Sequence, residues 1–124
     1  MILNHISLGT NHVERAITFY DSILKTLGVH RAHTIEGVAA AYGEQFEFWI
    51  GTPCDSQQAT HGCGTHVAFN APSREAVDAF YQSAIELGAQ CQGKPGLRPE
   101  YGDTYYAAYV KDLDGNKIEA VTFS

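Results

Sequence analysis

The sequence predicts an α+β fold built from two copies of a βαβββ module. Both halves of the chain start with a histidine inside a strand pattern, His5 and His66, and each continues into a helix pattern that carries a Phe-Tyr pair. Three further strand patterns, separated by turn residues, follow each helix pattern. A repeat of about half the chain length indicates two copies of one supersecondary unit. We place the first module at residues 1–51, a linker at 52–64 and the second module at 65–124.

Length and composition are those of one globular domain without a nucleic-acid or membrane partner. The 124 residues carry a net charge of −6, and their eight Lys and Arg form no basic stripe, which argues against a nucleic-acid partner. No apolar run approaches the ~18 residues of a membrane span, and no signal peptide is evident. The three cysteines lack a Cys-x-x-Cys motif, which is typical of reduced thiols. We therefore expect a cytoplasmic protein.

The first module is predicted from alternation and from one helical stripe. Alternation over residues 2–8 predicts a strand with His5 opposite the apolar face. Asn11 is the predicted N-cap of a helix with Glu14 as its capping-box partner, and Gly28 ends the helix. The predicted buried stripe of this helix is Val13, Ala16, Ile17, Tyr20, Ile23, Leu24 and Leu27.

Three short strands complete the first module, at residues 32–36, 38–42 and 45–50. In the last of them, alternation places Phe46, Phe48 and Ile50 on one face, and Glu47 and Trp49 on the other.

The second module repeats this plan with one insertion. Ser73 is the predicted cap of its helix, and Gly88 ends the helix. The predicted strands are residues 65–70, 89–92, 105–111 and 117–123, with a tight turn at 112–116. Residues 93–103 have no counterpart in the first module, and we interpret them as a loop inserted near the site.

Four ionisable residues stand on the strand faces that oppose the helices. His5 and His66 lie on the first strand of each module, and Glu47 and Glu119 lie on the last strand. If the two sheets wrap towards each other on these faces, the four side chains converge. Two imidazoles and two carboxylates suit a divalent ion such as Zn, Ni, Mn, Fe or Co. The remaining histidines are interpreted as non-ligands: His12, His30, His33 and His61.

Further residues are candidates for the substrate pocket. Trp49 shares a face with Glu47 and is expected to form an apolar wall, or else to be a core tryptophan. Arg98 is a candidate for an anionic substrate group, or else a surface charge. Tyr101 and Tyr106 are candidates for a hydrogen bond to a substrate oxygen.

These motifs resemble the vicinal oxygen chelate superfamily, which contains glyoxalases, bleomycin-resistance proteins and extradiol dioxygenases. The resemblance covers nearly the whole chain. The matching segments are Asn-His-Ile-Ser-Leu at 4–8, Phe-Tyr-Asp at 19–21, Thr-His-Val-Ala-Phe at 65–69, and Asp-Leu-Asp-Gly-Asn-Lys-Ile-Glu at 112–119. Leu113 stands where the commonest form of the last motif has proline.

The resemblance implies a cup-shaped mixed sheet around a divalent metal, with the helices on the outer face. Glyoxalase-like members use four ligand positions, which look like His5, Glu47, His66 and Glu119. Thiol transferases and dioxygenases of this superfamily use three ligand positions, which look like His5, His66 and Glu119. Bleomycin-binding members bind no metal.

The function implied is that of a glyoxalase-like isomerase or lyase. Its metal chelates two oxygens of a small substrate and stabilises an enolate or oxyanion. Glu119 is the first candidate for the proton-transferring base, and Glu47 the second. A three-ligand enzyme and a metal-free binding or resistance protein remain alternatives. The resemblance also implies a homodimer, and no residue set for glutathione is identifiable.

Overall fold

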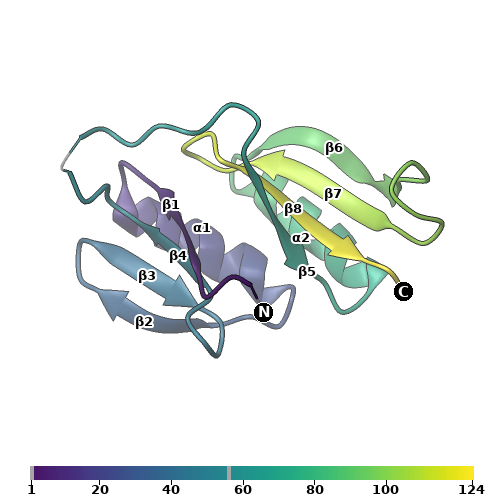
Figure 1. Cartoon of the computed structure of the whole chain (residues 1–124), viewed down its shortest axis with the longest axis horizontal. Helices are drawn as coiled ribbons and strands as arrows, with labels where there is room; N and C mark the ends of the chain where they lie inside the picture. The colour runs from purple at the N-terminus through teal and green to yellow at the C-terminus, as the bar shows by residue number, and fades with distance from the viewer. Residues whose placement is uncertain (1, 56) are drawn as a thin grey trace.

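Each half of the chain forms a four-stranded sheet with one helix, in a computed structural model that describes residues 2–55 and 57–124 (Figure 1). The elements of the first module are β1 (Ile6–Gly9), α1 (Val13–Lys25), β2 (Arg31–Ile35), β3 (Ala39–Tyr42) and β4 (Phe48–Gly51). Those of the second are β5 (His66–Asn70), α2 (Arg74–Glu86), β6 (Gln90–Leu97), β7 (Tyr106–Lys111) and β8 (Lys117–Thr122). The predicted α+β fold with two βαβββ modules is confirmed.

The two sheets have the same topology. Their strand orders are β1-β4-β3-β2 and β5-β8-β7-β6. The first and last strands of each module pair in parallel, and the other pairs are antiparallel. In Figure 1 both helices lie behind the sheets, and β1 and β5 are the strands nearest the centre. The sheets therefore present their open faces to the same side, and the expected cup is not closed within one chain.

The core lies between the sheets and the helices. Every residue of the predicted α1 stripe is buried. In the second module, Val77 and Phe80 of α2 are fully buried. Phe48 of one module packs edge-to-face on Phe69 of the other, with ring centroids 5.0 Å apart. In the described part of the chain, no helix is long and apolar enough to cross a bilayer.

The two helix starts differ from each other. Ser73 caps α2 as predicted, because its hydroxyl accepts the Ala76 N–H at 3.1 Å. At α1 the N-cap residue is His12, without a side-chain cap. The Asn11 side chain instead exchanges two hydrogen bonds with the backbone of Ala59 in the linker. The predicted Asn11 cap is therefore wrong, since a long-range contact takes the side chain that a local cap would use.

Three strand boundaries were also predicted wrongly. β1 begins at Ile6 and not at residue 2, so His5 lies just before the strand. β4 begins at Phe48, because Phe46 adopts a left-handed backbone conformation with φ of 57°. Phe46 therefore leaves the alternation that would put it beside Phe48. β6 extends to Leu97 through part of the predicted insertion, with register shifts on both sides of Gly93. This strand is at the edge of its sheet, where Pro95 and glycines are tolerated. Only the loop after Leu97 remains of the predicted insertion, and the hydrogen bond from the Arg98 N–H to the Tyr105 carbonyl closes it.

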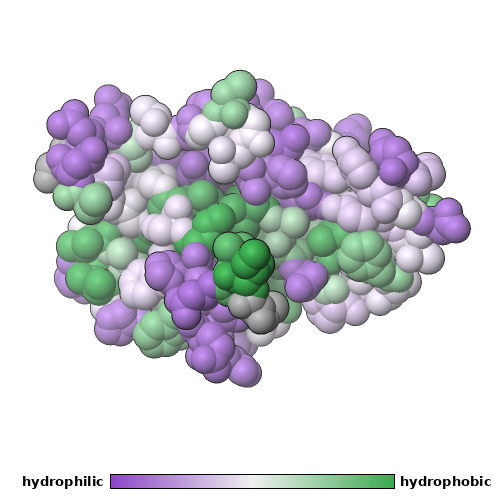
Figure 2. Space-filling view, in the orientation of Figure 1, coloured by the Kyte–Doolittle hydropathy of each residue, from purple (hydrophilic) through white to green (hydrophobic). Residues whose placement is uncertain are grey.

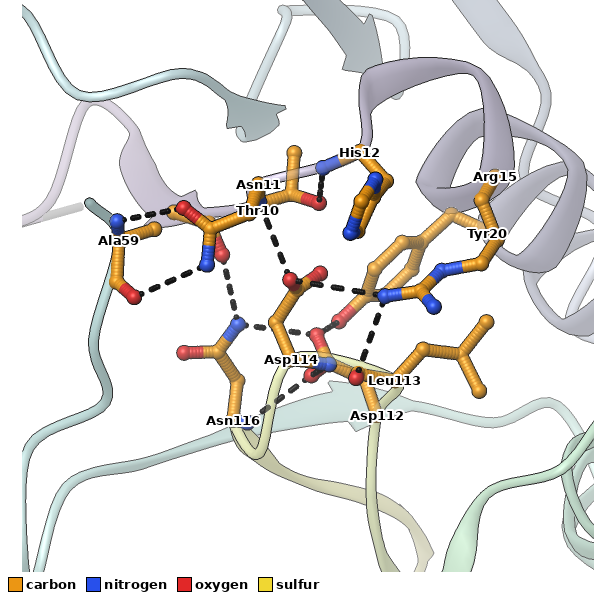
Figure 3. A network of polar contacts seen from close by, with 11 residues as sticks. Thr10, Asn11, His12, Arg15, Tyr20, Ala59, Asp112, Leu113, Asp114 and Asn116 are labelled. Carbon is orange, nitrogen blue, oxygen red and sulfur yellow. Dashed lines mark hydrogen bonds and ion pairs between the residues drawn. The ribbon is translucent and has the colours of Figure 1, made fainter. Parts of the chain in front are cut away.

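A buried polar network joins the two modules (Figure 3). The Asp112 carboxylate accepts the Tyr20 hydroxyl of α1 at 2.5 Å and the Asn116 amide at 3.0 Å. The Asn116 side chain also donates to the carbonyl of Gly9 at 3.0 Å. Beside it, Asp114 accepts the backbone N–H of Asn11. The predicted tight turn is thus confirmed, and its acidic residues bind the first module.

Stability is expected to fall at alkaline pH through Tyr20. Burial first, and then the charge of Asp112, raise the pKa of Tyr20 well above 10.0. The neutral phenol is therefore favoured in the folded state, and its contribution is complete below pH 10 and is lost as the pH rises further. Urea unfolding at pH 8 and pH 10.5 should show this loss. The decline should be smaller in Tyr20→Phe, and an equal decline in both proteins would contradict the assignment to Tyr20.

Candidate metal and substrate site

His66 and Glu119 form a close pair on the open face of the second sheet. β5 and β8 pair in parallel with Ala68 opposite Glu119, so His66 lies one alternation step away on the same face. The His66 Nε2 atom is 3.1 Å from the Glu119 Oε1 atom. Glu119 is only 1% exposed, whereas the His66 side chain is 43% exposed. A buried carboxylate is costly without partners, so the contacts around Glu119 define the site.

Tyr105 holds the second oxygen of that carboxylate. Its hydroxyl donates to Glu119 Oε2 at 2.5 Å. Burial, and then the hydrogen bond and charge of Glu119, raise the pKa of Tyr105 above its usual range. The phenol therefore remains a donor at neutral pH, and it orients Glu119 so that Oε1 faces His66. Such outer contacts set the orientation of metal-binding carboxylates in proteins.

A cavity of about 410 Å³ opens beside the pair. Arg98 and Tyr101, both predicted pocket residues, line it together with His66 and Glu119. Tyr105, Tyr109 and Lys117 are among the lining residues that the sequence analysis did not identify. Tyr109 pairs directly with Glu119 across β7 and β8. Simple alternation along residues 105–111 would have found both tyrosines, because they share the face of Glu119.

The same alternation places Tyr106 outside this cavity. Its hydroxyl donates to Asp78 of α2 at 2.7 Å, and the Arg74 guanidinium lies 5.0 Å from its ring centroid. Tyr106 is therefore on the helix side of the sheet. Its prediction as a substrate-pocket residue is corrected to Tyr105, its neighbour in sequence.

His5 and Glu47 lie together, but at a different cavity. Ile6 donates its backbone N–H to the Glu47 carbonyl at 2.9 Å, which places the two residues side by side just before β1 and β4. They line a cavity of about 460 Å³ that reaches His66 between the modules. Within residues 2–55 and 57–124, no three His, Cys, Asp or Glu side chains gather closely enough to hold a metal ion. The four predicted ligands therefore do not converge in one chain.

Strand register shows which residues of the two modules are equivalent. In the first module, the residue after Ile6 pairs with Trp49. In the second, the residue after Val67 pairs with Glu119. Since the repeat aligns His5 with His66, Trp49 occupies the position equivalent to Glu119. Glu47 corresponds instead to Lys117.

Trp49 belongs to a small aromatic cluster on the open face of the first sheet. The His33 ring stacks on Phe46 at 5.8 Å between centroids, with 9° between the planes. Trp49 meets both rings edge-on. His33 and Trp49 flank Ala41 in the same row, where the second module carries Gly93, Tyr109 and Glu119. Trp49 is thus half-buried on the open face and is not a core tryptophan.

The donor chemistry of the second-module pair fits a divalent ion. Two donor atoms each ~2.1 Å from one ion are separated by roughly 3.0–3.4 Å for octahedral or tetrahedral angles. The 3.1 Å between His66 Nε2 and Glu119 Oε1 is within that range. An imidazole and a carboxylate are ligands for Zn, Ni, Mn, Fe and Co alike.

The sequence matches one protein-family model over residues 2–120. That model describes the Glyoxalase/Bleomycin resistance protein/Dioxygenase superfamily. A comparison with curated proteins found no match.

Solved structures share the fold over almost the whole chain. A glyoxalase/bleomycin resistance protein from Albidiferax ferrireducens T118 is 36% identical, with a TM-score of 0.87 and 98% of each chain covered. The fosfomycin resistance protein FosX from Listeria monocytogenes is 20% identical, with a TM-score of 0.68 and coverage of 98% of this chain and 92% of that one. Lactoylglutathione lyase from Agrobacterium tumefaciens is 17% identical, with a TM-score of 0.67 and coverage of 98% and 92%. The last two similarities show the fold alone.

Proposed function

Because the chain belongs to the Glyoxalase/Bleomycin resistance protein/Dioxygenase superfamily, we propose that it is a metal-dependent enzyme acting on a small oxygen-rich substrate. The observation that carries this proposal is the His66–Glu119 pair, 3.1 Å apart beside an open cavity. A divalent ion held there would stabilise negative charge that develops on a substrate oxygen. Tyr105 would keep the carboxylate in place through its hydrogen bond to Oε2.

The third ligand in this proposal is His5 of a second copy of the chain. The open faces of the two sheets look to the same side (Figure 1), so one chain does not bring its own sheets face to face. A two-fold related copy would place its first module over the second module of this chain. Exposed apolar side chains support such an interface, among them Ile2, Leu3 and Phe46. Figure 2 shows apolar surface at the centre of this face.

Trp49 at the fourth position favours three ligands from the protein. This supports the three-ligand class of enzyme over a glyoxalase-like centre with four, since an indole does not bind a divalent ion as a carboxylate does. Glu47 is then not a metal ligand. Glu47 is exposed and lies beside His5, so the second copy that provides His5 would also bring its Glu47 to the site. We propose this Glu47 as the proton-transferring base and Glu119 as the ligand. A positioned carboxylate beside the substrate has the chemistry of a general base.

Mixing two variants that each lack one proposed metal ligand tests whether the site is shared between two chains. His5→Ala and Glu119→Gln should each lose tight metal binding. When the two are refolded together, half of the dimers pair unlike chains, and one of the two sites in each such dimer has every ligand intact. Metal content should therefore recover to roughly a quarter of the wild-type level.

The readout is metal per chain after dialysis against a dilute chelator, with each variant refolded alone as the control. Recovery near zero, with both variants folded, would contradict a site shared between chains. Full metal retention by His5→Ala alone would remove His5 from the site.

A further inference from the structure

Two cationic side chains border the cavity beside Glu119 without carboxylate partners of their own. The Arg98 guanidinium and the Lys117 ammonium each lie 5.3 Å from the centroid of the Tyr109 ring. Among the side chains that the structure describes, the ion pairs within 4.0 Å involve Arg15, Arg31 and His66, and neither of these two cations. Their charge is therefore open to a ligand in the cavity.

Arg98 is held in place by the backbone of β6. Its Nη2 atom donates to the carbonyl of Lys94 at 2.6 Å, and its Nη1 atom donates to the carbonyl of Leu97 at 3.4 Å. A guanidinium has five N–H donors, so three are left after these contacts. Arg98 is thus positioned before any ligand arrives, which lowers the entropic cost of binding.

Two glycines make room for this arrangement. A Cβ atom on Gly93 would lie 3.2 Å from Arg98 Nη2 and 2.9 Å from Tyr109 Cδ1. A Cβ atom on Gly96 would lie 3.2 Å from Arg98 Nη1. The Arg98 guanidinium therefore packs against Gly93 and Gly96 of the bulged strand β6, next to the Tyr109 ring.

Lys117 approaches the Tyr109 ring from β8. It lies on β8 two residues before Glu119 and pairs with His66 in the register of β5 and β8. The acidic groups at the cavity are Glu119, which is bound by His66 and Tyr105, and Glu100. Two cations and phenol hydroxyl groups thus line the part of the cavity that extends from the ligand pair.

We propose that Arg98 and Lys117 bind an anionic group of the substrate, a carboxylate or a phosphonate. This inference rests on the proposed function, because it places that group beside the oxygens that the metal would hold at His66 and Glu119. Arginine suits the task, since its planar fork matches the oxygen atoms of both anions. The substrate class is therefore a small acid with an oxygen function close to its anionic group.

Binding of simple anions by the metal-free protein tests this inference. Methylphosphonate and acetate are titrated in the presence of EDTA, with acetamide as the uncharged counterpart of acetate, and backbone amide shifts of Gly93 and Tyr109 are followed by NMR. Both or one of the anions should bind, and acetamide should bind at least tenfold more weakly. Whichever anion binds more tightly identifies the type of acid.

Variants at the two cations complete the test. Arg98→Met and Lys117→Met should each weaken anion binding roughly tenfold or more, and Arg98→Lys should restore part of it. Lys94→Met is the matched control, because it removes a nearby charge but keeps the carbonyl that holds Arg98. Thermal unfolding checks that each variant is folded.

Three results would overturn the inference: acetamide binding as tightly as acetate, no binding of either anion, or anion affinity unchanged in both methionine variants. These results are independent of metal content. If the protein failed to bind an added divalent ion, the proposed function would be refuted, and anion binding that depends on Arg98 would still leave the inference standing.

Discussion

Replacing His66 by alanine or Glu119 by glutamine is expected to abolish tight metal binding. The two groups face each other at 3.1 Å, and Glu119 is buried with both oxygens engaged. Each replacement removes one of three proposed protein ligands, so the affinity for the metal should fall by well over 100-fold. Replacing a residue that only hydrogen-bonds to a ligand typically costs about 10–100-fold. Calorimetric titration of chelator-treated protein with Zn, Ni or Mn measures the loss of metal affinity.

Two further variants make this experiment specific. Tyr105→Phe should weaken metal binding about 10–100-fold, because Glu119 loses the donor that orients it. Glu47→Gln should leave metal affinity within about threefold of wild type, since Trp49 holds the position equivalent to Glu119 and the structure places Glu47 outside it. A loss in Glu47→Gln as large as in Glu119→Gln would restore the four-ligand centre. Undiminished metal in both His66→Ala and Glu119→Gln would refute the site.

Replacing Asp112 by alanine is expected to cause the largest loss of stability of any single change at the module boundary. Asp112 accepts hydrogen bonds from Tyr20, from the Asn116 side chain and from backbone N–H groups of its own turn (Figure 3). Its removal leaves several buried donors unpaired, and we expect a loss of about 2–4 kcal/mol in the free energy of unfolding. Urea unfolding at pH 7 measures this.

Asp103→Ala is the matched control for that change. Asp103 is an exposed carboxylate on the loop before β7, so its replacement should alter stability by less than about 0.5 kcal/mol. Equal effects of the two replacements would show that the Asp112 network contributes nothing beyond surface charge. Tyr20→Phe should lose about 1 kcal/mol, because it deletes one hydrogen bond and keeps the ring.

Much of the architecture was predictable because it depends on local periodicity. The α1 stripe, the Ser73 cap and the turn at 112–116 all follow from residues close in sequence, and the structure has all three. The errors occur where a distant contact competes. Asn11 binds the linker instead of capping α1, and the edge position of β6 admits Pro95 into a strand that composition alone would end.

The sequence by itself determined the two modules, the faces of their strands and the residues that can provide metal chemistry. Alternation places Glu47 and Trp49 on one face of their strand, and it cannot choose between them, because both satisfy the same period of two. Only the pairing of β1 with β4 decides, and it sets Trp49 in the row that Glu119 occupies in the other module. Register is set by contacts between strands about 40 residues apart in sequence.

The relative orientation of the two modules is likewise decided only by the tertiary structure. The repeat predicts two equivalent histidines, and the packing of the modules keeps their open faces side by side, with His66 beside Glu119 and His5 beside Glu47. Buried contacts between Asp112, Tyr20 and Asn116 stabilise that orientation. Such contacts join residues from both ends of the chain, and their geometry exists only once the two modules have packed.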